Sequence, residues 1–168
     1  YWLLLAAMIA VYLVMLLWSL PHLRLLAGGL EAFDLRPTGY SQAEAQALLT
    51  ALGDEGRAFY LGVQHRLDML YPGLLAIVLV WTFRALVPGW PGLALAALAV
   101  IGSGLDYLEN SRVADLLRAV PEAVTADQIA AASAATIGKS IAVTLALVAL
   151  LVVLAWRGWQ RWGGARKT

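Results

Sequence analysis

Three ionisable residues stand at nearly the same depth in three separate apolar runs. Asp68, Asp106 and Lys139 each lie 16 or 17 positions from the far end of their run (68 to 84, 90 to 106 and 139 to 156). At about 1.5 Å per helical residue, each stands roughly 24–26 Å from that end. A hydrocarbon core is about 30 Å thick, so all three fall just inside one face of a bilayer. Ionisable groups held there are costly and by default mark a functional site.

The run that holds Asp68 carries a polar stripe at helical spacing. Its members share one face, with His65 beside it: Arg57, Tyr60, Gln64, Asp68 and Tyr71. Because Pro72 has no N–H, the carbonyl of Asp68 loses its usual helical partner and is free to face a ligand, a water or a neighbouring side chain. A structural role for Asp68, at the end of an interfacial helix, and a functional role stay equally open.

The third run places two carboxylates on one helical face. Asp106 and Glu109 are three residues apart, and Asn110 lies at the edge of the same face. Two acids this close in a partly dry setting suit acid–base chemistry or cation binding. The alternative is that Glu109 is solvated and pairs with Arg112. For Asp106, the functional interpretation is favoured.

The fourth run has Lys139 at the border of a small hydroxyl face formed by Ser133, Thr136, Ser140 and Thr144. Such hydroxyls are more often packing contacts than catalysts. We expect Lys139 to pair with Asp68 or Asp106, although its ammonium could also reach the interface. The predicted catalytic residues are Asp68, Asp106 and Glu109. The predicted ligand-binding residues are Arg57, Tyr60, Gln64, His65, Tyr71, Asn110 and Lys139.

A metal site is the weaker interpretation of the same residues. His65 with Asp68, and Asp106 with Glu109, form pairs at i, i+3 on two helices, a spacing used in carboxylate metal bundles. The other two runs supply no acid, and Lys139 would compete for the carboxylates. Phosphate-binding loops and hydrolase motifs are absent from the sequence. No cofactor is predicted.

Composition makes this chain an integral membrane protein. Of its 168 residues, 61% are hydrophobic and 14% charged, with a mean hydropathy of +0.74, whereas soluble domains carry about 25% charged residues. Cysteine is absent, which excludes disulfides and thiolate chemistry. The net charge of +1 gives no electrostatic basis for binding nucleic acid. Because the chain begins at Tyr1, we expect further residues to precede it.

The apolar runs predict an all-α, four-span bundle that forms one domain over residues 1–168. The predicted spans are 2–20, 67–83, 93–108 and 137–156, with outer connections at 21–66 and 109–136. The first connection begins as a weakly structured stretch. Ser41 to Glu44 then forms a capping box for a short amphipathic helix on the outer face, which Gly53 can end. Thr125 to Gln128 forms a second capping box, before the last helix.

Orientation rests on charge and on tryptophans. Basic residues of the tail and the inner turn favour a cytoplasmic position for both termini: Arg84, Arg157, Arg161, Arg166 and Lys167. The two long connections hold six arginines of their own, so a raw count does not decide. All eleven acidic residues fall between Glu31 and Asp127, and most tryptophans gather at the tail end. We therefore expect the long connections to lie outside a bacterial inner membrane.

Several motifs resemble one family of small bacterial four-span membrane proteins of uncharacterised function. They are Gly39-Tyr-Ser41, Leu52-Gly-Asp-Glu-Gly-Arg57 with Tyr60, Leu67-Asp-Met-Leu-Tyr-Pro72 and Asp106-Tyr-Leu-Glu-Asn110. The resemblance covers roughly residues 33–145. It implies the four-span architecture and no activity.

Together these residues predict a polar cavity at the outer leaflet that binds an amphipathic or lipidic small molecule. If the protein is an enzyme, proton transfer by Asp68 and Asp106 is the natural reaction class; whether it is one stays open. One alternative is a non-catalytic accessory subunit of a larger membrane complex, partnered by another membrane protein or by copies of itself. Another is an ion-coupled transporter or channel, which four spans would support only as an oligomer.

Overall fold

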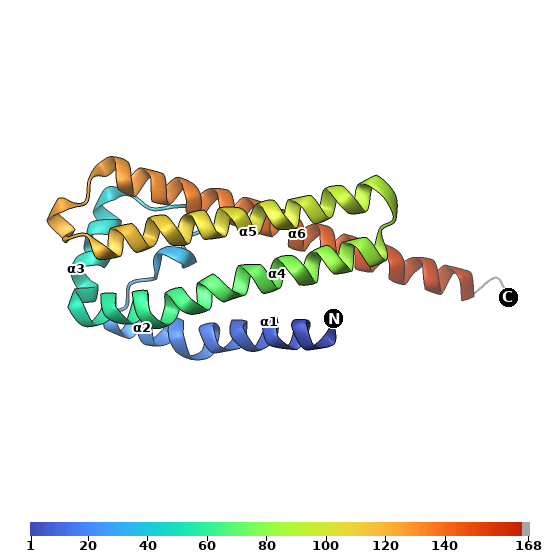
Figure 1. The fold of residues 1–168 in the computed structure, drawn as a ribbon, viewed down its shortest axis with the longest axis horizontal. Helices are drawn as coiled ribbons and strands as arrows, with labels where there is room; N and C mark the ends of the chain where they lie inside the picture. The colour runs from blue at the N-terminus through green and yellow to red at the C-terminus, as the bar shows by residue number, and fades with distance from the viewer. Residues whose placement is uncertain (166–168) are drawn as a thin grey trace.

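The computed structural model describes residues 1–165, with side chains as far as Arg161. It is an all-α bundle of long helices joined at two ends (Figure 1). The helices are α1 (Trp2–Val14), α2 (Leu20–Leu26), α3 (Gln42–Phe59), α4 (His65–Leu86), α5 (Gly89–Arg118) and α6 (Ala126–Ala165). Two π-helical turns, η1 (Met15–Ser19) and η3 (Tyr60–Gln64), join α1 to α2 and α3 to α4, while η2 (Phe33–Leu35) and η4 (Pro121–Ala123) are 3-10 turns.

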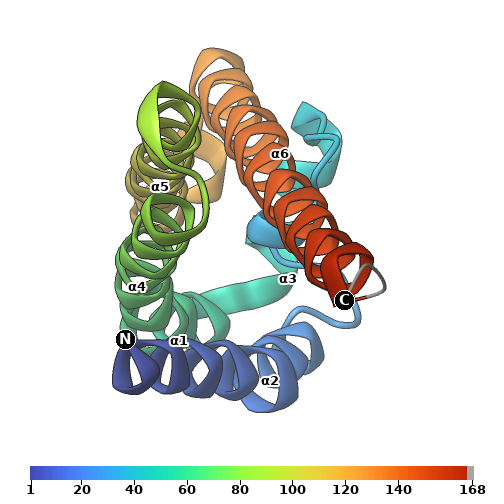
Figure 2. The same ribbon diagram turned by 90° about the vertical axis from the view of Figure 1, so that its right-hand side faces the viewer.

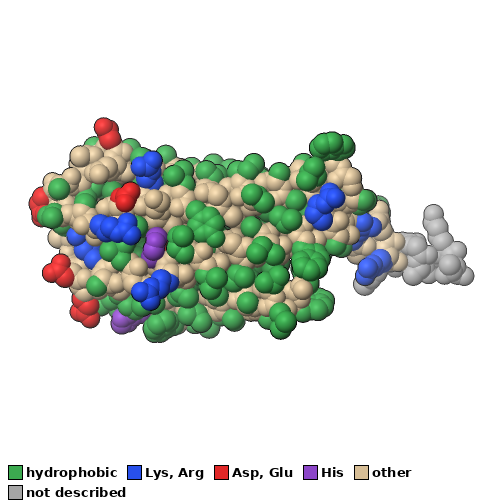
Figure 3. Space-filling view, in the orientation of Figure 1, with side chains coloured by type: hydrophobic (Ala, Val, Ile, Leu, Met, Phe, Trp, Pro, Cys, Tyr) green, Lys and Arg blue, Asp and Glu red, His purple; other side chains and the backbone are tan. Residues whose placement is uncertain are grey.

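Four helical stretches are long and apolar enough to cross a membrane, namely Trp2–Leu26, Gln42–Leu86, Gly89–Arg118 and Ala126–Arg161. The chain therefore has the architecture of a multi-pass membrane protein, and the predicted four-helix bundle is confirmed. Figure 3 shows the charged side chains gathered at the two ends, with an apolar band between them. Acidic, basic and histidine side chains lie together at one end of that face, whereas the other end shows basic side chains without acidic ones.

The four stretches pack in the order α1, α4, α5, α6. Helix α5 contacts both α4 and α6 along much of its length, and α1 packs on α4. Seen end-on, α4 and α5 form one side of a roughly triangular outline, and α6 and α1–α2 form the other two (Figure 2). At Gly102 the two helices are in contact, since a Cβ there would lie 3.4 Å from the Val143 side chain, an ordinary van der Waals distance. Helices α1 and α6 are thus the terminal members of the packing order.

The first helical stretch continues past its predicted end at residue 20, as far as Leu26. Proline at position 21 cannot donate the usual backbone bond. The π-helical turn Met15–Ser19 directly precedes it, and the Leu20 N–H already reaches back to the Met15 carbonyl. This wider turn lets the helix absorb Pro21 without ending, which the sequence pattern did not predict.

The next segment, residues 27–41, was expected to be weakly structured but folds back into the bundle. We call it the re-entrant segment. Ala32, Phe33 and Tyr40 are buried, and η2 contacts α6, so that its light-blue turn lies inside the outline of Figure 2. Backbone N–H groups of Phe33 and Tyr40 donate to the Tyr60 hydroxyl (3.1 Å) and to Ser133 Oγ (2.9 Å). Long-range side-chain partners therefore hold this segment in place.

The remaining boundaries follow the local signals. The Ser41–Glu44 capping box is present, and the chain kinks at Gly53, where φ is +54°. Thr125 and Gln128 form the second predicted box, and α5 ends at Arg118. After the short turn that follows α4, α5 begins at Gly89, earlier than the predicted start of this span at residue 93.

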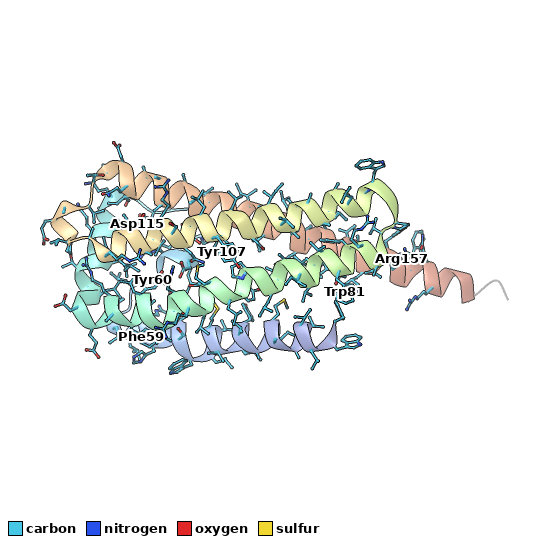
Figure 4. All side chains as sticks on the ribbon, viewed as in Figure 1. Phe59, Tyr60, Trp81, Tyr107, Asp115 and Arg157 are labelled. Carbon is cyan, nitrogen blue, oxygen red and sulfur yellow. The ribbon has the colours of Figure 1, made fainter. Side chains whose placement is uncertain are left out.

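The bundle has two separate cores, one at each end of the long axis. The connection end, which includes the re-entrant segment and α3, holds the larger cluster, from Leu23 through Phe33 and Leu48 to Ala132. The turn end, near the α4–α5 turn, holds Leu75, Leu79, Phe83, Ala99 and Ala146. Figure 4 labels Tyr60 and Asp115 at the first end, and Trp81 and Arg157 at the second.

Candidate functional site

A cavity of about 290 Å³ lies where the first and last helical stretches face the re-entrant segment. Apolar side chains of the first stretch form one wall, and Val143 with the hydroxyl residues Ser140 and Thr144 of α6 forms another. The charged and amide side chains of the lining are those of Asp34, Gln64, Asp68, Asp106 and Lys139. The structure thus brings together the three residues that the sequence placed at one depth.

Lys139 is the cation of this site. Its Nζ lies 3.3 Å from Asp106 Oδ1 and also pairs with Glu109 Oε2. The Lys139 side chain is 13% exposed, and Glu109 is completely buried behind it. The ammonium therefore has two carboxylate partners within the protein, which confirms the predicted pairing with Asp106.

Asp68 is held by a relay of hydrogen bonds from the first helical stretch. Ser19 Oγ donates to Gln64 Oε1 (2.5 Å), and Gln64 Nε2 donates to Asp68 Oδ2 (2.7 Å). The first bond fixes the orientation of the Gln64 amide, so that its NH₂ group points at the carboxylate. This leaves Asp68 Oδ1 with no hydrogen bond to any described residue.

Pro72 has the effect predicted from its missing N–H. The carbonyl of Asp68 accepts a hydrogen bond from Asn110 Nδ2 (3.0 Å), and the same amide approaches Asp106 Oδ1 (3.4 Å). Asn110 is buried and lies behind the cavity, between α4 and α5. It therefore fixes the two carboxylate-bearing helices relative to each other and has no place in the cavity lining.

Asp34 is the site residue that the sequence analysis missed. It lies in η2 and lines the cavity, its Oδ2 accepts a hydrogen bond from the Tyr60 hydroxyl (2.9 Å), and its Oδ1 is buried without a partner. The available signal was an acid between two apolar residues, Phe33 and Leu35, within a connection. Phe33 is buried but Leu35 is 45% exposed, so the pattern does not show which helices the segment meets.

Tyr40 closes the back of the site. Burial raises the pKa of its phenol well above the ordinary value, so the group is neutral. Its hydroxyl and Glu109 Oε1 are both buried without a hydrogen-bond partner. Buried polar atoms of this kind call for an explanation, and here they gather around the carboxylates of one site.

Four of the predicted ligand-binding residues do not line the cavity: Arg57, Tyr60, His65 and Asn110. Arg57 lies eleven residues before Asp68, or about 16 Å along the helix, which is too far to reach the cavity. It donates instead to the carbonyls of Ala119 (2.9 Å) and Leu49 (3.4 Å). It joins α3 to the end of α5. His65 is partly exposed and is not part of the lining. Arg57 and His65 were predicted to bind the ligand, and the structure places neither in the cavity lining.

The other predicted residues fall into two layers. Gln64, Asp68, Tyr71, Asp106 and Lys139 line the cavity, and the Tyr71 ring lies against that of Tyr12, with centroids 5.7 Å apart. The second layer, outside the lining, consists of Tyr60, Glu109 and Asn110. This division separates groups able to touch a ligand from groups that position them.

The geometry does not favour a metal. Among the side chains described, no three His, Cys, Asp or Glu residues lie close enough to hold an ion. His65 stands apart from the carboxylates, and the Lys139 ammonium occupies the space between Asp106 and Glu109 where a cation would sit. The proposed ligand pairs are thus not brought together.

The arrangement places oxygen acceptors and one ammonium at the floor of an apolar cavity, which suits binding of a polar head and proton exchange with it. Asp68 and Asp106 come from two different helices, so both can face one guest. Comparison of the chain with protein-family models, with curated proteins and with solved structures finds no match.

Proposed function

We propose that the cavity binds an amphipathic or lipidic small molecule. The observation that carries this proposal is the cavity itself, which has ionisable residues at its floor and apolar side chains on its walls. Its walls come from the first helical stretch and from α6, the terminal members of the packing order, and acyl chains of a surrounding bilayer would reach it between them. A molecule with a polar head and an apolar chain matches both parts of the lining.

Any reaction at this site would be a proton transfer. Asp68 and Asp106 line the cavity from α4 and α5, and each is held by a neighbour that fixes its direction, Gln64 for the first and Lys139 for the second. Two carboxylates fixed at one cavity can serve as the acid and base for isomerisation, hydration or hydrolysis. Glu109 acts indirectly, by holding the Lys139 ammonium.

Transport of ions across the membrane is a poorer fit. The polar residues of the site lie at one depth along the bundle. The core at the turn end is formed by apolar side chains, among them Leu79, Phe83 and Ala146. An ion path would need polar groups through that region. The accessory-subunit hypothesis does not account for a cavity lined by three carboxylates, so the binding function is the better proposal.

Binding can be tested with decan-1-ol and the protein in phosphatidylcholine nanodiscs, by native mass spectrometry of the released protein. We expect one molecule of decan-1-ol per chain. The variant Ser140→Trp fills the cavity from α6 and should no longer bind decan-1-ol. The variant Ile141→Trp, on the exposed face of the same helix, should still bind it. Equal retention by both variants, or none by the parent protein, would refute the proposal.

We further propose that the connection end faces outward from a bacterial inner membrane. Support comes from Arg84, Arg157 and Arg161 at the turn end, where no acid lies nearby. Arg166 and Lys167 also counted toward this orientation, and they lie outside the described residues. Since the chain has no cysteine, Thr50→Cys and Ala85→Cys can report on the two ends separately. An impermeant maleimide applied to intact cells should label the first and spare the second; the reverse pattern would overturn the orientation.

A further inference from the structure

The cavity has an imbalance of charge that bears on its ligand. Asp34, Asp68 and Asp106 line it, whereas Lys139 is the single lysine or arginine among its described lining residues. Glu109 lies directly behind and shares that ammonium. Four carboxylates therefore surround one cation, in a place where buried charges require partners.

The charge of the Lys139 ammonium is already paired with two carboxylates of the protein, which disfavours an anionic guest. Lys139 already contacts Asp106 and Glu109, so an anion would have to compete with both. Two arginines of the connection end are engaged with Glu31: Arg24 pairs with its carboxylate (3.2 Å), and Arg36 donates to its carbonyl (2.8 Å). Neither arginine lines the cavity.

The unoccupied groups are acceptors. Asp68 is 95% buried (5% exposed), yet only its Oδ2 has a hydrogen bond, from Gln64. Asp34 Oδ1 is buried without any partner. A carboxylate oxygen left unsatisfied in an apolar setting is costly, and a donor carried by the ligand would remove that cost.

We infer that the ligand carries a protonated amine, and that its ammonium sits between Asp68 and Asp34 while its chain lies along Met15, Leu16 and Leu20. This inference rests on the proposed function and narrows it to amphipathic amines. An ammonium supplies several donors and one positive charge, which suit the free Asp68 Oδ1 and the charge of Asp34 in the same lining. The leucine and methionine side chains of the first helical stretch offer the chain an apolar wall.

The test compares three probes that share one chain length: decylamine, decan-1-ol and decyl sulfate. Each is titrated against the protein in phosphatidylcholine nanodiscs and counted by native mass spectrometry. We expect decylamine to bind about 10- to 100-fold more tightly than decan-1-ol, the range that a charge-assisted hydrogen bond supports. Decyl sulfate should bind more weakly than the alcohol.

Two variants locate the effect. Asp68→Asn keeps the shape of the side chain and should abolish the preference for decylamine while decan-1-ol binding persists. Asp115→Asn is the matched control, because its carboxylate lies on α5 outside the cavity and is 58% exposed; it should leave the preference intact.

The outcomes separate this inference from the proposal beneath it. If all three probes bind equally and Ser140→Trp abolishes that binding, the cavity is a binding site and the amine inference is wrong. A preference for decylamine that survives Asp68→Asn would also overturn the inference. If Ser140→Trp changes nothing for any probe, the proposed function fails together with it.

Discussion

Among the side chains that the structure describes, the buried apolar cluster of the connection end has sixteen members, whereas that of the turn end has five. Helix α1 has no buried residue, and side chains such as Leu3, Ile77 and Leu151 are exposed along the bundle. The first end is therefore packed like a water-soluble domain, by removing apolar area from water. The second is held by close helix contacts, since an apolar side chain gains little by leaving lipid.

The two ends also differ in how polar groups hold them. At the connection end, side chains fix loops far away in sequence, as Tyr60 does for Phe33 and Arg57 does for Ala119. At the turn end, Arg157 donates to the carbonyl of Leu86, the last residue of α4. The cavity lies at the border of the two regions. Its ionisable residues can be positioned there because the connection end is rigidly packed.

Breaking the ion pair at this border should have the largest effect. Lys139→Met leaves Glu109 buried without its partner, which we expect to cost about 3–5 kcal/mol of unfolding free energy. The measurement is unfolding by dodecyl sulfate in mixed micelles. Arg118→Met is the control, because its pair with Asp115 is exposed and should be worth less than about 1 kcal/mol. Similar losses in both variants would show that Glu109 does not depend on the ammonium.

The contrast between the two ends can be measured with one substitution in two places. Leu48→Ala removes a completely buried side chain from the connection end and should cost about 2–5 kcal/mol. Leu151→Ala removes the same atoms from a side chain that is 66% exposed, and should change the stability by less than about 0.5 kcal/mol. Unfolding in mixed micelles gives both values. Equal effects would contradict the division into two kinds of core.

The re-entrant segment offers a sharper test of packing at the connection end. Gly28 and Gly39 both have positive φ, of +62° and +80°. A Cβ at Gly39 would lie 2.5 Å from Ser133 Oγ, whereas one at Gly28 meets nothing within 4 Å. Gly39→Ala should therefore cost about 1–3 kcal/mol more than Gly28→Ala, which carries the backbone penalty alone. Thermal unfolding of the two variants compares them, and equal melting temperatures would show that Ser133 does not confine the segment.

The four spans and their caps could be predicted from the sequence because they are local properties. Apolar run length located the helices, and the capping boxes at Ser41 and Thr125 marked two helix starts that the structure confirms. Helical depth grouped Asp68, Asp106 and Lys139 correctly. Each of these needed only the periodicity and rise of a helix.

The parts that could not be predicted depend on contacts between distant residues. Nothing near Asp34 in the sequence indicates that its segment turns back to meet Tyr60, 26 residues later. The polar stripe suggested a shared role for Arg57 and Asp68. Spacing along a helix gives the face on which a side chain lies, but it does not tell whether the cavity beside Asp68 extends as far as Arg57. The continuation of the first helix past Pro21 required a π-helical turn, for which apolar periodicity carries no signal.

Removing a helix N-cap should have the smallest effect on stability. The two ends of the bundle nevertheless differ in their caps. The Ser41 hydroxyl accepts from the Glu44 N–H (3.3 Å) at the start of α3, whereas α5 begins at the turn end without a side-chain cap. Ser41→Ala should therefore cost about 1 kcal/mol. Thr50→Ala removes an exposed hydroxyl from the interior of the same helix and should be neutral or slightly stabilising, because alanine favours helix. Melting temperatures of both variants test this, and a neutral Ser41→Ala would mean that packing at the connection end holds α3 without its cap.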